Sequence, residues 1–197
     1  MKKKVLSIVA VVLVLCCAIG GTLAWLTDKT DEVKNTFSPS DINITLTETP
    51  NTDTDNDGKA DAWKADMIPG FSYTKNPVVT VEDDSVDCYL FVKFEENGNP
   101  STYLTYASTL TAANGWTQGD GTSIPSNVWY RVVKAGDTTK SWNLLDGNTI
   151  AVKDTVTKDN MATAANAELV YTAYATQLYE SNGVEFTAAK AWANALA

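Results

Sequence analysis

The run from Cys88 to Phe94 constrains the fold most strongly, because apolar side chains occupy both of its faces. Alternate residues from Cys88 form one apolar face of an extended chain, and Tyr89 and Phe91 thicken the opposite face. A strand that is covered on both sides belongs inside a sheet that lies between other layers. This run therefore predicts the central strand of a β-sandwich.

Shorter segments with strand patterns, separated by turn residues, flank this central run. Apolar and polar residues alternate at 42–47, which is the period of a half-buried strand, and the alternation at 169–178 predicts a late core strand. The remaining expected strands are residues 78–81, 128–133 and 149–156. About seven short strands with turns between them predict an all-β fold, an antiparallel β-sandwich.

Two segments do not follow the period of a strand. Residues 104–114 mix Thr, Tyr and Ala, and they fit either a short helix or a loop with a strand. Near the C-terminal end, Phe186, Ala189 and Trp192 are three residues apart. This spacing predicts a short amphipathic helix within residues 186–197.

The first 24 residues have the layout of a secretory signal peptide. Three lysines at 2–4 precede an uncharged apolar run at 5–19, and small residues follow up to Ala24. We expect cleavage between Ala24 and Trp25, which would leave the residues from Trp25 onward as the mature chain. The alternative is an uncleaved N-terminal anchor, and that signal is the only expected link to a membrane.

Composition excludes several classes of function. The chain has 197 residues with a formal net charge of −9, and it contains no histidine. Removing residues 1–24 removes three lysines and leaves 12 basic against 24 acidic residues, a charge of −12. Such an acidic surface argues against binding to nucleic acid. The absence of histidine excludes Ser-His-Asp, Cys-His and HExxH chemistry, so we do not expect an enzyme.

An acidic loop at residues 51–64 is a candidate calcium site. Its pattern D-x-D-x-D-G-x-x-D places carboxylates at Asp53, Asp55, Asp57 and Asp61. Carboxylates at alternate positions, with a glycine that turns the chain, suit the oxygen ligands that Ca²⁺ prefers. Lys64 stands where an EF-hand loop would have its bidentate Glu, so the loop predicts either a partial Ca²⁺ site or a solvated acidic turn.

Three stretches resemble the TasA/camelysin family of exported proteins of Gram-positive bacteria. The first is GGTLAWLTD at 20–28, followed by NTFS and INITLTE. The second runs from the Ile-Pro-Gly turn at 68–70 through YTKNPVVTVEDDSVDCYLFVKFEENG. The third combines VYTAYATQ with EFTAAKAWANAL near the C-terminal end. The acidic loop at 51–64 is longer than the family pattern, so the resemblance says nothing about its role.

The resemblance implies a jelly-roll topology for residues 37–197 and a secreted, fibre-forming protein of a biofilm matrix or cell-surface layer. It also implies that a SipW-type signal peptidase removes the signal. Residues 25–36 would then be a donor strand that pairs with the sheet of the next subunit in a homo-oligomer, and the alternative for this segment is a disordered leader. The competing function is a monomeric secreted or surface binding module with a Ca²⁺-stabilised loop.

Two further readings come from residue types alone. Trp63, Trp116, Trp129 and Trp142 could stack on sugars, although aromatic residues also fill sandwich cores. Cys88 is the only cysteine after residue 24, and its apolar neighbours predict an inert thiol in the core. Some relatives in the resembled family are classed as metallopeptidases, but this chain lacks the histidine ligands that such a zinc site uses.

The acidic loop gives a direct test. If Asp53, Asp55, Asp57 and Asp61 ligate Ca²⁺, isothermal titration of the secreted chain with millimolar CaCl₂ will release or absorb measurable heat. A titration that matches the buffer blank would identify the loop as a solvated acidic turn.

Overall fold

Antiparallel strands dominate the computed structural model, which describes residues 41–49, 66–161, 167–181 and 183–197. Every strand pairing within these residues is antiparallel. The predicted all-β class is therefore confirmed. We describe the compact unit that begins at Ser40 and ends at Ala197.

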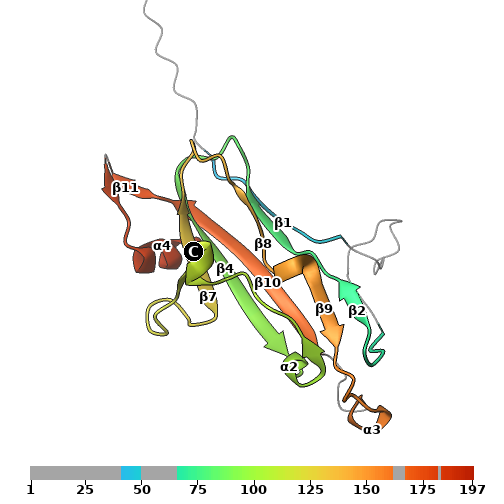
Figure 1. The fold of residues 1–197 in the computed structure, drawn as a ribbon. Coiled ribbons are helices and arrows are strands. Elements are labelled where there is room, and N and C mark those ends of the chain that lie inside the picture. The colour runs from blue at the N-terminus through green and yellow to red at the C-terminus, as the bar shows by residue number, and fades with distance from the viewer. Residues whose placement is uncertain (1–40, 50–65, 162–166, 182) are drawn as a thin grey trace, which may run out of the picture. The chain divides into compact units, whose positions relative to one another are not determined.

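The central strand is β4 (Cys88–Asn97), as its two apolar faces predict. It pairs along its whole length with β10 (Glu168–Gln177), from Cys88 opposite Gln177 to Asn97 opposite Glu168. On its other side it pairs with β7 (Val128–Val133), which in turn pairs with β6 (Thr117–Gln118). Figure 1 shows β4 and β10 as two long ribbons that lie side by side through the middle of the unit.

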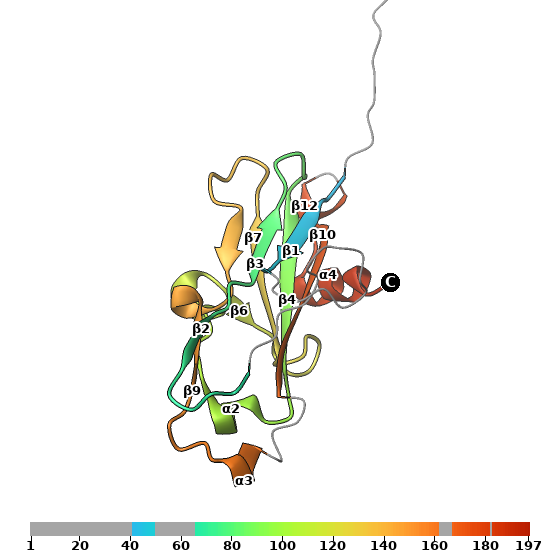
Figure 2. The same ribbon diagram turned by 90° about the vertical axis from the view of Figure 1, so that its right-hand side faces the viewer.

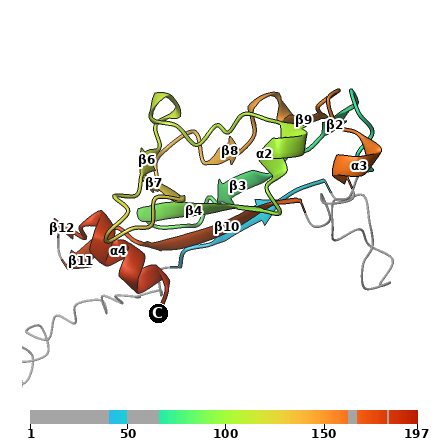
Figure 3. The same cartoon turned by 90° about the horizontal axis from the view of Figure 1, so that it is seen from below.

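Two three-stranded sheets form a second layer over this four-stranded sheet. One has the order β1-β3-β8 and the other the order β2-β9-β5. Figure 3 shows β8, β9 and β2 on one side of β4 and β10. The strands of this layer are β1 (Ile44–Thr47), β2 (Ser72–Thr74), β3 (Val78–Val81), β5 (Leu104–Thr105), β8 (Ser141–Asn143) and β9 (Thr149–Val152).

A hydrophobic core lies between the two layers. Cys88, Leu90 and Val92 from β4 pack there against Val79 and Val81 from β3, and all five are almost fully buried. A second cluster continues this core under the β2-β9-β5 sheet, where Ile150 and Val152 meet Leu169 and Tyr171 of β10. The alternation of β4 therefore buries its first face as predicted.

The other face of β4 is covered by the C-terminal helix α4 (Ala188–Ala195). Phe91 and Trp192 have ring centroids 5.2 Å apart, and Tyr174 of β10 meets Trp192 edge-on at 5.2 Å. Thr187 caps the helix, because its side chain accepts a hydrogen bond from the amide of Lys190. Figure 2 shows α4 on the side of β10 and β4 that faces away from β2 and β9. The predicted short helix is confirmed.

Short elements complete the unit. The hairpin of β11 (Tyr179–Ser181) and β12 (Val184–Glu185) links β10 to α4. The remaining short helices are α2 (Pro100–Tyr103), α3 (Lys158–Met161) and the two 3-10 turns Ala112–Asn114 and Asp146–Asn148. The segment 104–114 thus contains both of its expected alternatives, a two-residue strand and a helical turn.

The structure corrects one strand boundary and leaves one topology untested. The strand expected at 149–156 ends at Val152, because the chain turns after Lys153, whose carbonyl accepts a hydrogen bond from the amide of Val156. Val156 is buried without belonging to a strand. The jelly-roll connectivity stays a prediction.

The packing of Phe91 predicts a large loss of stability on truncation. Phe91→Ala would leave a cavity beneath Trp192, so we expect the free energy of unfolding in urea to fall by about 3–5 kcal/mol. The matched control is Val132→Ala on the neighbouring strand, where the side chain is exposed and we expect a loss below about 1 kcal/mol. Equal losses in the two variants would contradict this view of the core.

Candidate functional site: the outer edge of strand β10

The longest edge strand of the described unit is β10. It pairs with β4 over ten residue pairs, and no other described strand hydrogen-bonds to its outer side. The other edge strands, such as β1, β6 and β8, have two to four residues. A ten-residue edge presents a row of backbone donors and acceptors about 33 Å long.

This edge lacks the devices that usually protect edge strands. Between Glu168 and Gln177 the sequence is LVYTAYAT, which contains only Leu, Val, Tyr, Thr and Ala and neither a charged residue nor a proline. Charges, prolines and short length are the common means by which monomeric proteins prevent strand addition. The backbone of β10 is therefore well suited to accept another strand.

Strand β1 lies beside β10 without pairing with it. β1 hydrogen-bonds to β3 in the opposite layer, and its backbone comes close to that of β10. The edges of the two layers thus come together along one seam of the unit. Figure 2 shows β1 running next to β10 and β4 along this seam.

Side-chain contacts hold β1 firmly in this position. Near its start, the amide of Asn43 donates to Ser85 Oγ at 3.0 Å, and Asn43 Nδ2 donates to Asp84 Oδ2 at 2.9 Å. Just after its end, Glu48 accepts two 2.8 Å hydrogen bonds from Lys75 Nζ, whose residue is only 7% exposed. This half-buried ion pair is costly to break, because the buried Lys75 ammonium would lose a carboxylate partner.

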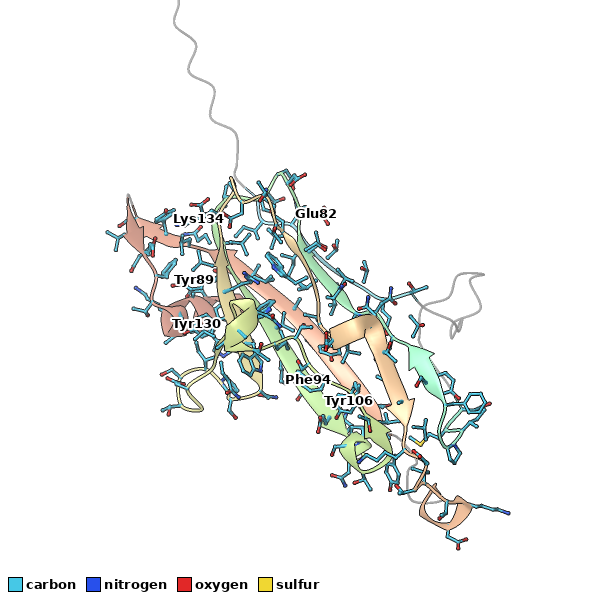
Figure 4. The ribbon with its side chains drawn as sticks, viewed as in Figure 1. Glu82, Tyr89, Phe94, Tyr106, Tyr130 and Lys134 are labelled. Atoms are coloured by element: carbon cyan, nitrogen blue, oxygen red, sulfur yellow. The ribbon has the colours of Figure 1, made fainter. Side chains whose placement is uncertain are left out.

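Aromatic residues form the inner support of β10. The rings of Phe94 and Tyr171 stack with centroids 4.8 Å apart, and Tyr106 meets Phe94 edge-on at 6.5 Å. The Tyr106 hydroxyl donates to Glu96, whereas the buried Tyr171 hydroxyl has no hydrogen-bond partner among the described residues. Burial, followed by the charges of nearby glutamates, raises the pKa of Tyr171 well above its ordinary value. Figure 4 labels Phe94 and Tyr106, which lie toward the Glu168 end of β10.

The opposite seam of the sandwich is closed by a cation between two indole rings. The Arg131 guanidinium carbon lies 4.2 Å from the ring centre of Trp142 and 5.1 Å from that of Trp116. Burial lowers the pKa of Arg131, and its Nε atom has no hydrogen-bond partner among the described residues. Trp116 is 2% exposed, so it offers no free face to a sugar.

Charged groups gather at the end of β10 where it meets the β11–β12 hairpin. Lys134 Nζ lies 3.2 Å from the Tyr179 hydroxyl, 3.4 Å from Glu185 Oε1 and 3.7 Å from Asp87 Oδ2. The hydrogen bond to Tyr179 and the one to Glu185 raise the pKa of Lys134. Figure 4 shows Lys134 at the same end of the unit as Glu82.

The sequence-predicted site residues mostly lie outside the described residues. These are the cleavage pair Ala24 and Trp25, the segment 25–36, the loop carboxylates Asp53, Asp55, Asp57 and Asp61, and Trp63. The Ca²⁺ site, the signal and the donor strand therefore stay predictions. In the described part of the chain, no group of three or more His, Cys, Asp or Glu side chains is placed to hold a metal ion.

The prediction for Cys88 is confirmed. Its side chain is fully buried in the core between the two layers. Burial, together with the negative charge of Asp87, raises the pKa of the thiol to about 11. A thiol that stays protonated and inaccessible is unreactive near neutral pH.

Sequence reasoning identified β10 as a strand but missed that it is an edge strand. The position of a strand in a sheet depends on distant pairings, which the alternation of Leu169–Thr176 does not encode. The absence of charge and proline at residues 169–176 is a visible signal, but a central strand has the same composition.

Comparison of the chain with protein-family models, with curated proteins and with solved structures found no match. Among the described residues, the search for a helix long and apolar enough to cross a membrane found none.

Two tyrosines give a matched test of the core beside β10, because the hydroxyl of Tyr89 is hydrogen-bonded and that of Tyr171 has no partner among the described residues. Tyr171→Phe removes a buried hydroxyl that has no hydrogen-bond partner among the described residues, so we expect the unfolding free energy to stay unchanged or to rise by about 1 kcal/mol. Tyr89→Phe removes a hydroxyl that donates to the Phe186 carbonyl at 3.0 Å, so we expect a loss of about 1 kcal/mol. Urea denaturation measures both, and a greater loss from Tyr171→Phe would contradict the described contacts.

Proposed function

We propose that this protein is an exported structural protein whose subunits assemble into extracellular fibres by strand donation. The observation that carries the proposal is the ten-residue outer edge of β10, which is unpaired among the described strands and has neither charge nor proline between its end residues Glu168 and Gln177. The donated strand is the segment 25–36, which signal cleavage at Trp25 would release. Its twelve residues reach about 40 Å when extended, enough to cover all of β10.

Antiparallel addition to β10 favours an open chain of subunits. A strand antiparallel to β10 begins beside Gln177 and ends beside Glu168. From there, the chain between Thr36 and Asp41 spans at most about 18 Å before the next subunit begins. In that subunit Asp41 lies at the opposite end, because its carbonyl accepts a hydrogen bond from the amide of Val86, close to Cys88 and Gln177.

The consequence is a head-to-tail arrangement. The Glu168 end of each acceptor meets the Asp41 end of its donor, so the contact is heterologous and can repeat without closing. A donated strand parallel to β10 would instead bring two like ends together and favour closed pairs. The antiparallel mode also matches every strand pairing within the described residues.

Export and charge agree with assembly outside the cell. While the apolar segment 1–24 is attached, the donor segment has no free end to enter a neighbouring seam. After cleavage, a charge of about −12 keeps subunits apart until specific strand pairing overcomes their repulsion. We place the fibres in a biofilm matrix or cell-surface layer, in line with the resemblance described above.

Deletion of the donor segment tests the proposal. The chain that begins at Trp25 should form filaments visible by electron microscopy, and the variant that lacks residues 25–34 should stay a folded monomer by light scattering. A length-matched variant, Thr27→Pro with Thr30→Pro, keeps the segment but removes two backbone N–H donors. These two amides point to opposite sides of an extended chain, so one of them is lost from the pairing in either register, and the variant should also fail to polymerise.

Filaments that persist in the deletion variant would refute strand donation. A chain from Trp25 that stays monomeric, with and without Ca²⁺, would favour the alternative of a monomeric secreted binding module with a Ca²⁺-stabilised loop.

A further inference from the structure

An exposed apolar turn projects from the end of the unit that contains Glu168. Ile68 and Phe71, which flank Pro69 and Gly70, are 43% and 55% exposed. Gly70 has a positive φ of 77°, and its amide donates to the Val152 carbonyl at 3.0 Å, so the turn is fixed to β9. Exposed large apolar side chains on a rigid turn are typical of a contact surface.

A shallow depression of about 370 Å³ lies at the other end of the unit. Its lining is Val86, Asp87, Ala135, Gln177 and Tyr179. The Tyr179 ring is held in place, because Lys134 Nζ hydrogen-bonds to its hydroxyl and lies 5.3 Å from its ring centre. The depression thus combines aliphatic and aromatic walls with a polar rim, which suits an apolar side chain.

The turn and the depression lie at opposite ends of the β4–β10 ladder. Met67, next to the turn, and Leu169, at the beginning of β10, pack against the same buried cluster, whereas Gln177 at the end of β10 lines the depression. Ten residues of strand, about 33 Å, separate these two ends. Figure 1 shows β2, which follows the turn, and β11, which begins with Tyr179, far apart at opposite ends of β10.

We infer that the turn at 68–71 of one subunit docks into the depression of the next copy of this chain. The inference rests on the proposed strand donation, and it adds a second contact with named partners. The Phe71 side chain enters beside Val86 and Ala135 and packs against the Tyr179 ring. Because the two surfaces are different and lie at opposite ends, the contact is heterologous and repeats along a fibre.

The place of Asp41 in the fold points to a second copy as the occupant. Asp41 hydrogen-bonds to Val86, which is itself part of the depression. If residues 25–36 pair with the β10 of a neighbour, the chain from Thr36 to Asp41 holds the neighbour's Glu168 end within about 18 Å of this depression. The exposed turn at that end is then the apolar surface nearest to it.

Assembly assays on the chain that begins at Trp25 test the inference. We expect Ile68→Ser with Phe71→Ser, and separately Ala135→Glu, to raise the critical concentration for filament formation at least tenfold. Leu196→Ser is the matched control, because Leu196 is 57% exposed but belongs to neither surface. Circular dichroism should show that each variant is folded.

Cross-linking identifies the contact itself. In filaments of the Phe71→Cys/Ala135→Cys variant, mild oxidation should give a ladder of disulfide-linked subunits. The Phe71→Cys/Leu196→Cys variant should give none, because Leu196 lies outside the contact. The native Cys88 does not interfere, because it is buried. Filaments that form normally, without a ladder and without a change in critical concentration, would overturn the docking contact and leave strand donation standing. If the unsubstituted chain forms no filaments at all, both proposals fail.

Discussion

The ladder between β4 and β10 is the interaction on which the rest of the structure depends. It brings ten residues of the late chain against ten residues of the early chain, and both faces of β4 are then covered by other elements. The apolar sides of Leu90 and Phe91 face different clusters, so one strand connects the sandwich core to the layer under α4. Because such long-range pairing gains energy only after a large loop has closed, the fold is expected to form cooperatively.

Local patterns in the sequence predicted burial better than they predicted pairing. The two covered faces of 88–94 and the spacing of Phe186 and Trp192 were enough to predict the central strand and the C-terminal helix. The strand expected at 149–156 was too long. Val156 is apolar because its side chain packs in the core, and its backbone does not belong to a strand. Arg131 resembles a surface charge in the sequence, but Trp116 and Trp142, from distant segments, enclose it within the seam.

The same distinction explains why the candidate site was only partly predictable. The composition of β10 is visible in the sequence, while its edge position follows from the lack of a described partner on its outer side. A strand without charge or proline is suitable for a sheet interior and hazardous at an edge. In β10 these two properties coincide, and strand addition by a second subunit would resolve the conflict by converting the edge into an interior position.

The fastening of β1 at both ends has a mechanical consequence. Asn43 and Glu48 fix this strand to the body of the unit through Ser85, Asp84 and the buried Lys75. A pulling force that arrives through the preceding chain is therefore transmitted first to these contacts, and a force that acts along the strands loads many hydrogen bonds in shear together. A unit loaded in this way resists extension far better than one whose strands are peeled apart one pair at a time.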